Sequence, residues 1–245
     1  MKILAVQLDI AWEDPQANFE KVEKLLADAK PEPNTLVVLP EMFATGFSMS
    51  MEATEPEGGP IASFLQQLAQ RWQVTLVGGV AINGHNRALV FAPNGTRIAD
   101  YTKIKPFAVG GETYAPGKQQ VVFSWAELRV TPFICYDLRF PEVWRVAAAA
   151  WRPELYLDIA SWPSARAHHW VRLLQARAIE NQAYVLGVNR CGTDPYFSFP
   201  GRTMLVDWHG EIVADAGSEE KTLLASLDLP ALHEYRSQLR FLDDI

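Results

Sequence analysis

The chain has 245 residues, of which 49% are hydrophobic and 21% are charged, and its formal net charge at pH 7 is -7. This composition is typical of a globular protein, and the length fits one large domain or two small ones. Strands and helices are mixed throughout the sequence, which favours a single domain spanning residues 1–245. The sequence has no cluster of basic residues that would bind nucleic acid. No apolar run reaches the roughly 18–20 residues that cross a bilayer. We therefore expect neither a nucleic-acid partner nor a membrane partner.

The N-terminal segment and the two cysteines indicate where the protein works. The apolar run at 2–8 is interrupted by Gln7 and followed by Asp9, so it is too short for a signal peptide. We predict that this run is a first strand and that the protein is cytoplasmic. Cys135 and Cys191 make neither a disulfide framework nor a metal cluster, and we expect no metal and no cofactor. In a reducing compartment, each cysteine is better considered as a free thiol.

Apolar and amphipathic segments alternate along the chain. Helices are indicated where apolar residues recur every three to four positions, three times with a proline near the start. Strands are indicated by short apolar runs between Gly, Pro or Asn turns. In chain order, we predict a strand at 2–8, a helix at 15–30, a strand at 35–39, a helix at 61–72, strands at 74–82, 88–91, 97–103, 121–125 and 128–135, a helix from Pro141, a strand at 155–160, a helix at 167–181, strands at 184–188, 204–208, 211–214 and 222–227, and a helix at 230–238.

Three polar residues stand at the ends of predicted buried strands. Glu41 follows the second strand, Lys103 ends the strand at 97–103, and Cys135 ends the strand at 128–135. Each is costly to bury without a partner, and strand ends in α/β folds are where ligand sites are usually built. Taken singly, each also has a structural interpretation, because a lone buried cysteine is more often an inert small hydrophobe. The residues around them decide between the two.

The sequence contexts of these residues resemble the nitrilase superfamily of carbon–nitrogen hydrolases, whose signature is a Glu-Lys-Cys triad in that chain order. The three motifs are LPEMF at 39–43, YTK at 101–103 and CYDLRFPE at 135–142. Three longer runs are similar to one branch, the bacterial omega-amidases. They are PEMFATGFSM at 40–49, SWPSAR at 161–166 and ARAIENQ at 176–182. The resemblance extends over nearly the whole chain.

The resemblance implies an α/β fold of four layers, an α-β-β-α sandwich in which two mixed sheets pack face to face with helices outside. The alternation of strands and helices agrees with this. It also implies a homodimer formed through the outer helices. The partners would be a small-molecule amide and water, without a cofactor.

The resemblance implies hydrolysis of the terminal amide of a 2-oxo acid amide, 2-oxoglutaramate or 2-oxosuccinamate, through a cysteine thioester. Cys135 would attack the amide carbonyl while Glu41 accepts the thiol proton. Lys103 and the backbone N–H of Tyr136 would form the oxyanion hole. Glu112 would orient Lys103 or the attacking water.

A pocket for such a substrate must neutralise a carboxylate and enclose a short carbon chain. The planar fork of an arginine binds both oxygens of a carboxylate, and Arg166 in the SWPSAR run is our first choice. Arg139 is the second candidate, although a structural pair with Asp137 or Glu142 is the preferred interpretation. The candidate substrate-binding residues are Arg166, Arg139, Ser161, Trp162, Phe43 and Phe47.

Two assignments have rivals in the sequence. Lys105 would share a strand face with Lys103, but Tyr101 stands two residues before Lys103, as in the family motif. His168 and His169 suggest a Cys-His hydrolase instead. Neighbouring residues on a helix point about 100° apart, so at most one of these histidines would face the thiol.

Three classes of function remain open at this point. The first is an omega-amidase, and the second is an N-carbamoyl or aliphatic amidase of the same superfamily. The third is a non-catalytic nitrilase-like interaction protein. The intact triad argues against the third class, because a protein without catalysis has no physical need to bury all three residues.

Overall fold

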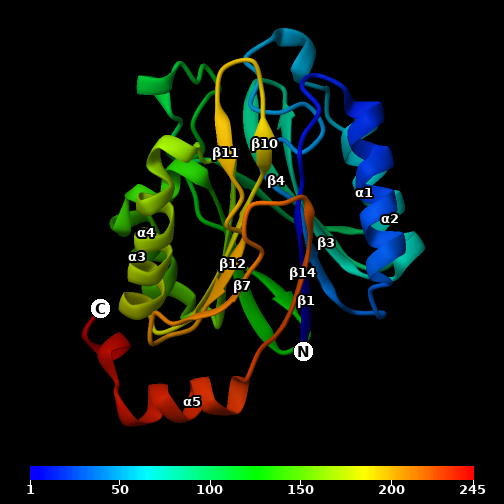
Figure 1. Cartoon of the computed structure of the whole chain (residues 1–245). Helices are drawn as coiled ribbons and strands as arrows, with labels where there is room; N and C mark the ends of the chain where they lie inside the picture. Colours follow the sequence, from blue (N-terminus) through cyan, green and yellow to red (C-terminus); the bar gives the residue numbers. More distant parts are fainter.

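The computed structural model describes residues 1–245, with the exception of the side chain of Met51. Two six-stranded sheets form its centre (Figure 1). The first sheet has the strand order β14 (Lys221–Ser226), β1 (Lys2–Gln7), β2 (Leu36–Val38), β3 (Thr75–Ile82), β4 (His85–Phe91) and β5 (Arg97–Thr102). The second has the order β13 (Ile212–Asp215), β12 (Met204–Val206), β9 (Tyr184–Asn189), β8 (Leu155–Ala160), β7 (Leu128–Ile134) and β6 (Phe123–Trp125).

Both sheets are mixed. In the first, β1, β2 and β3 are parallel, whereas β14, β4 and β5 pair antiparallel with their neighbours. In the second, β7, β8 and β9 are parallel, whereas β6, β12 and β13 are antiparallel. The parallel strands are buried on both faces, which explains their nearly continuous apolar sequences.

Four helices cover the outer faces of the sheets. Figure 1 shows α1 (Pro15–Ala29) and α2 (Pro60–Trp72) on one side, with α3 (Pro141–Trp151) and α4 (Ala167–Asn181) on the other. The first three begin with a proline, whose fixed φ suits the first helical turn. The predicted four-layer α-β-β-α sandwich with two mixed sheets is therefore confirmed.

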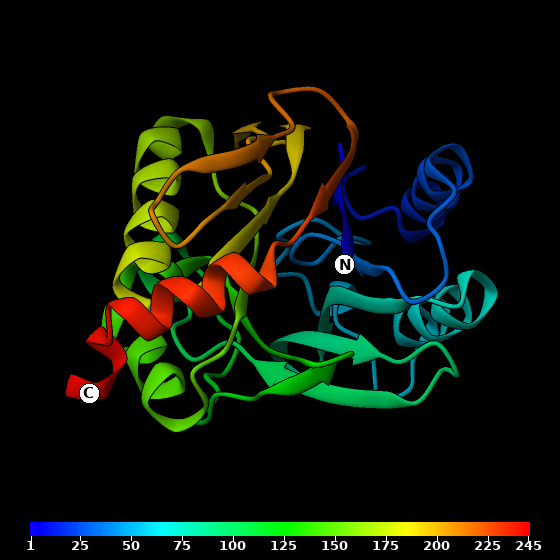
Figure 2. The same cartoon turned by 90° about the horizontal axis from the view of Figure 1, so that it is seen from below.

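The last helix, α5 (Leu229–Gln238), belongs to neither helical layer. Figure 2 shows it running across one end of the sandwich toward the side of α3 and α4. The guanidinium of Arg236 fixes it there by donating hydrogen bonds to the carbonyls of Arg152, Pro153 and Gln182. Within the part of the chain that the structure describes, none of the helices has the length and apolar character of a membrane span.

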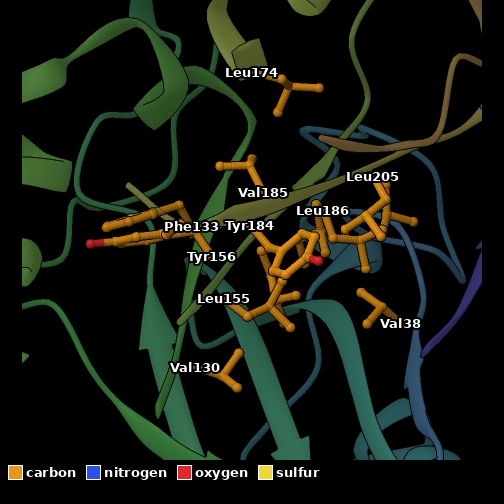
Figure 3. Packing of buried hydrophobic residues seen from close by; sticks show 14 of the residues in the cluster. Val38, Val130, Phe133, Leu155, Tyr156, Leu174, Tyr184, Val185, Leu186 and Leu205 are labelled. Atoms are coloured by element: carbon orange, nitrogen blue, oxygen red, sulfur yellow. The ribbon is translucent and has the colours of Figure 1, made fainter. Parts of the chain in front are cut away.

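The main core lies between the two sheets and continues to the helices of the second sheet. Figure 3 shows Val38 of the first sheet in one cluster with Leu155, Leu186 and Leu205 of the second. A second apolar cluster fills the space between the first sheet and helices α1 and α2. These two clusters bury the apolar faces that the sequence pattern predicts.

The structure departs from the sequence prediction at strand ends and in one hairpin. The strand predicted at 128–135 ends one residue earlier because Cys135 has φ 49° and begins the 3-10 turn η3 (Cys135–Arg139). The hairpin of β10 (Cys191–Thr193) and β11 (Ser198–Pro200) was not predicted. Its strands are short and lack apolar alternation, and tertiary contacts of the buried Arg190 support it. The other 3-10 turns are η1 (Met51–Ala53), η2 (Ala108–Gly110), η4 (Ser164–Arg166) and η5 (Phe241–Asp244).

Candidate active site

Glu41 is held in a tight backbone turn at the end of β2. The next residue, Met42, has φ 46°, which few residues with a side chain adopt. The turn packs on Gly79 of β3, where an added Cβ would lie 2.6 Å from the Cα of Glu41. Only glycine permits this approach, and it seats the carboxylate in the interior with no exposed surface.

The cation of Lys103 lies between two buried carboxylates. Its Nζ is 2.9 Å from Oε1 of Glu41 and 2.8 Å from Oε2 of Glu112. Asn86 of β4 donates to both of these glutamates, at 2.7 Å and 3.2 Å. This arrangement gives each buried charge an opposite charge or a hydrogen-bond donor, which burial requires.

Backbone N–H groups complete the fixation of the two carboxylates. Ser161 N donates to Oε2 of Glu41 at 2.8 Å, and Phe107 N donates to Oε2 of Glu112. Glu41 therefore receives donors from both sheets, since Ser161 follows β8 and Lys103 follows β5. Both carboxylates are held in place before any substrate arrives.

Cys135 is the most accessible of these groups. It follows β7, and its side chain is partly exposed in a pocket. Burial of its immediate surroundings raises the pKa of the thiol well above its ordinary value, and the negative charge of Glu41 adds to this, while Lys103 opposes it. The resting thiol is therefore protonated, and attack requires a base that removes its proton.

Lys103 keeps its positive charge. Burial by itself lowers the pKa of the ammonium, but the charges of Glu41, Glu112 and Cys135 outweigh burial and raise it above the ordinary value. A fixed cation beside a thiol stabilises negative charge that develops during attack. The structure thus brings together a thiol, a carboxylate and a cation, and these belong to the three residues of the predicted triad.

The thiol lines a pocket in which six of the twelve lining residues are aromatic. Two guanidinium groups, from Arg139 and Arg166, also line it. Arg139 lies 4.6 Å from the ring centroid of Trp162, and Arg166 lies 5.3 Å from that of Phe107. The lining residues are Phe47, Phe107, Gly110, Cys135, Tyr136, Arg139, Ser161, Trp162, Pro163, Arg166, Phe197 and Phe199.

Neither pocket arginine forms an ion pair with a carboxylate among the side chains that the structure describes. Burial lowers the pKa of Arg139, and the like charge of Arg166 lowers it further. The structural pairs that the sequence suggested for Arg139 are not formed. Asp137 accepts hydrogen bonds from Tyr101 and from backbone N–H groups instead, and Glu142 lies 3.9 Å from Lys105. Two unpaired cations in one pocket make it suited to an anion.

One of the candidate substrate-binding residues is corrected by the structure. Phe43 does not line the pocket, because its ring is fully buried between the first sheet and the helices, 6.2 Å from Phe19 and 6.1 Å from Phe64. The backbone N–H groups of Ser161 and Trp162 are not free to bind a substrate. They donate to Glu41 and to Asn189, although both residues do line the pocket.

The alternative catalytic candidates, Lys105, His168 and His169, are not among the residues that line the pocket. Lys105 follows the end of β5 and does not share a strand face with Lys103, and its Nζ lies over the ring of Phe140 at 4.7 Å. Nδ1 of His169 is 3.3 Å from a nitrogen of Arg139, whereas His168 is exposed. Cys191 is buried in β10 and is not among the residues that line the pocket.

Sequence reasoning missed several residues of the site. Asn86 and Asp158 are polar residues within buried strands, the same signal that identified Glu41 and Lys103. Phe107, Phe197 and Phe199 come from loops and from the unpredicted hairpin, and their sequence gives no comparable signal.

The carbon-nitrogen hydrolase family model matches residues 2–237 of the chain. The protein belongs to this family. It is 38% identical to an omega-amidase of Yersinia enterocolitica over 97% of this chain and 94% of that one. It is 31% identical to a 2-oxoglutaramate amidase of Bacillus subtilis over 99% and 96% of the two chains. The structure of a carbon-nitrogen hydrolase superfamily protein from Xanthomonas campestris, with an arsenic adduct in its active site, is similar with a TM-score of 0.93. That protein is 32% identical, and the match covers 100% of this chain and 97% of the other.

Membership of this family gives the reaction class. This protein is an amidase that acts on carbon–nitrogen bonds other than peptide bonds. The fold agrees with this assignment, since the same two-sheet arrangement is present in the similar structure. The predicted resemblance to the nitrilase superfamily is confirmed.

Proposed function

We propose that this carbon-nitrogen hydrolase is an omega-amidase that converts a short 2-oxo acid amide, 2-oxoglutaramate or 2-oxosuccinamate, to the acid and ammonia. The observation that carries the proposal is the presence of two unpaired guanidinium groups in the same pocket as the thiol. A neutral amide offers nothing to neutralise these cations, whereas the carboxylate of an acid amide does. The names of the Yersinia and Bacillus relatives support the same substrate class.

In the first half-reaction, Sγ of Cys135 attacks the amide carbonyl as Glu41 takes the thiol proton. The substrate oxygen becomes negative and is stabilised by Nζ of Lys103 and by the backbone N–H of Tyr136. Glu41 then gives its proton to the departing nitrogen, so ammonia leaves and a thioester remains. The raised pKa of the thiol makes this proton transfer necessary.

In the second half-reaction, water attacks the thioester while Glu41 again accepts a proton. Collapse of the intermediate releases the acid and returns the proton to the thiol, so the sum is amide plus water to acid plus ammonia. Glu112 keeps the cation of Lys103 beside Glu41 through its own ion pair. A single fixed carboxylate thus serves as base in both steps.

The two arginines are tested by comparing substrates. We expect Arg166→Ala or Arg139→Ala to lower kcat/KM for 2-oxoglutaramate by about ten- to hundredfold, which corresponds to the loss of about 1.5–3 kcal/mol from a charge-assisted contact. A neutral aliphatic amide of similar length should lose much less, because it never made the contact. The measurement is the ratio of kcat/KM for the two substrates, with ammonia release as the assay for each.

The control for this experiment is Arg172→Ala, because Arg172 is an exposed residue of α4 that contacts only Gln175. The ratio of kcat/KM for the two substrates in this variant should match that of the wild type. An unchanged ratio in both pocket variants would show that the arginines do not bind the substrate carboxylate. An equal loss on both substrates would assign them a structural role.

We further propose that residues 1–245 work as one catalytic domain in a cytoplasmic homodimer. The outer helices α3 and α4 carry the exposed apolar side chains of Val146 and Ile179, 53% and 49% exposed, which suit contact with a second copy. Light scattering after size exclusion measures the mass of the particle and so tests the dimer.

A further inference from the structure

Asp158 is a buried acid that the mechanism above does not use. It lies within β8, a strand whose residues are all buried, and its own side chain has no exposed surface. An acid at such a position costs free energy of folding unless a contact offsets the cost. Its register neighbour on β9 is Gly187, where an added Cβ would meet Leu174 and Trp170 of α4. Asp158 therefore faces the layer of α3 and α4.

Among the residues that the structure describes, the side chain of Asp158 has one hydrogen-bond partner, the backbone of Cys135. Its Oδ1 accepts the backbone N–H of Cys135 at 2.6 Å. Cys135 has φ 49°, a conformation that is unfavourable for a residue with a side chain and persists only where its surroundings hold it. The pairing of β7 with β8 ends at Ile134, so this N–H lies beyond the strand ladder, and Asp158 supplies the acceptor that it needs.

The surroundings of Asp158 disfavour a negative charge. Among the side chains that the structure describes, no cation lies within ion-pair distance of it, and its Oδ2 has no hydrogen-bond partner. Burial raises the pKa of its carboxyl well above the ordinary value, and the nearby charge of Asp137 raises it further. Both effects favour the protonated, uncharged form of the carboxyl.

We propose that Asp158 is a positioning residue that holds the backbone of Cys135 and thereby aims Sγ at the substrate carbonyl between Glu41 and Lys103. The inference rests on the proposed role of Cys135 as nucleophile. An uncharged acid suits this task, because a second anion beside the thiol would oppose the negative charge that sulfur carries during attack and departure. The neutral acid fixes geometry without that electrostatic cost.

Two substitutions separate the hydrogen-bond acceptor of Asp158 from its charge. Asp158→Asn keeps an oxygen acceptor and is uncharged, so kcat should stay within about threefold of the wild type. Asp158→Leu has a similar shape but no acceptor. We expect it to lower kcat by about ten- to hundredfold at nearly unchanged KM, since a displacement of about 1 Å at a reacting atom has effects of this size. A loss that appeared in KM instead of kcat would contradict a positioning role.

The second readout is the rate of Cys135 alkylation by iodoacetamide as a function of pH, which needs no substrate. Asp158→Asn should leave the midpoint of this profile unchanged. A lower midpoint would show that Asp158 is an anion in the wild type and would overturn the proposal. The matched control is Thr131→Val, because Thr131 is also buried, lies on the neighbouring strand β7 and has no partner for its hydroxyl. It should change neither kcat nor the profile.

A failure of the positioning proposal can be distinguished from a failure of the proposed function. If 2-oxoglutaramate is not a substrate, kcat is measured on a simple aliphatic amide, and the alkylation profile is unaffected by that failure. If Asp158→Leu does not fold, Asp158→Ala takes its place, because alanine also lacks an acceptor. A lowered kcat in the variant without an acceptor, together with a kcat and profile near the wild type in Asp158→Asn, supports positioning by an uncharged acceptor. A wild-type kcat in the variant without an acceptor, or a kcat reduced more than tenfold in Asp158→Asn, overturns it.

Discussion

At the scale of single residues, the site separates groups by their access to solvent. Glu41, Lys103 and Glu112 are buried together, whereas the thiol of Cys135 lies at the bottom of an open pocket. A small molecule in the pocket can therefore reach the thiol, while the three buried charges are kept from solvent. Electrostatic interactions are stronger in such a water-poor region, so a single fixed cation and a single carboxylate have large effects.

The two neighbouring lysines differ in their expected importance. Lys103→Ala removes the cation between two buried carboxylates, and we expect turnover to be lost and the unfolding free energy to fall. Lys105→Ala removes an ammonium that is partly exposed and 3.9 Å from Glu142, so activity should be largely retained. Ammonia release and urea unfolding measure both effects. Activity lost in the Lys105 variant and kept in the Lys103 variant would assign the catalytic cation to Lys105.

At the scale of elements, the β10–β11 hairpin forms part of the pocket wall. Phe197, 47% exposed, lines both the pocket and a hollow beside it, whereas its neighbour Tyr196 lines only the hollow. Asp194 fixes the tip by accepting the backbone N–H groups of Tyr196 and Phe197, and its carboxylate lies 3.4 Å from the buried Arg190. A half-exposed aromatic ring held in this way separates two spaces.

The length of the acyl chain tests this role of the hairpin. Phe197→Ala should join the pocket to the hollow and raise kcat/KM for an amide two methylenes longer by about tenfold relative to the short one. This estimate follows from about 0.8 kcal/mol for each buried methylene. Tyr196→Ala is the control and should leave the ratio unchanged. A neutral aliphatic amide series gives the same comparison without the arginine contacts. Equal ratios in the wild type and in the Phe197 variant would show that the ring does not limit chain length.

At the scale of the whole molecule, the site exists only when the two sheets are docked. Glu41 and Lys103 follow strands of the first sheet, whereas Cys135 and Ser161 follow strands of the second. The hydroxyl of Tyr101 on β5 crosses between the sheets and donates to Oδ2 of Asp137 at 2.7 Å. Because Asp137 follows Cys135 closely in the η3 turn, this bond links the docking of the sheets to the geometry of the thiol.

The pH dependence of stability tests this link. Burial raises the pKa of Asp137 to about 6, although the Tyr101 hydrogen bond opposes the shift. The native state thus binds more protons than the unfolded state between about pH 4 and 6, so stability falls as pH rises through this window. Tyr101→Phe raises this native pKa further, which extends the fall to higher pH. We expect Tyr101→Phe to lower the free energy of unfolding by about 1.5–3 kcal/mol at pH 8 and by less at pH 4.5.

Unfolding by urea at the two pH values measures the effect of Tyr101→Phe. The matched control is Tyr156→Phe, because Tyr156 is equally buried but its hydroxyl has no partner among the described residues. That variant should lose little stability at either pH. An equal loss at both pH values in the Tyr101 variant would mean that its hydroxyl does not interact with an ionised Asp137.

The sequence by itself indicated one α/β domain, and its resemblance to a known family implied the four-layer architecture and the predicted triad. Apolar periodicity is a local property, so strands and helices were predictable to within a few residues at most ends. Glu41, Lys103 and Cys135 were recognisable because each ends an apolar run within a motif of neighbouring residues. Such signals need no knowledge of what packs against them.

Only the tertiary structure decided which side chains face the pocket. The direction of a side chain after a strand depends on the backbone turn there, and this is why Phe43 is buried against Phe19 instead of lining the site. The contact of Arg139 with His169 and the contact between Asp158 and Cys135 join segments about 20–30 residues apart. Partners at such separations are set by sheet register and helix docking, which local sequence patterns do not specify.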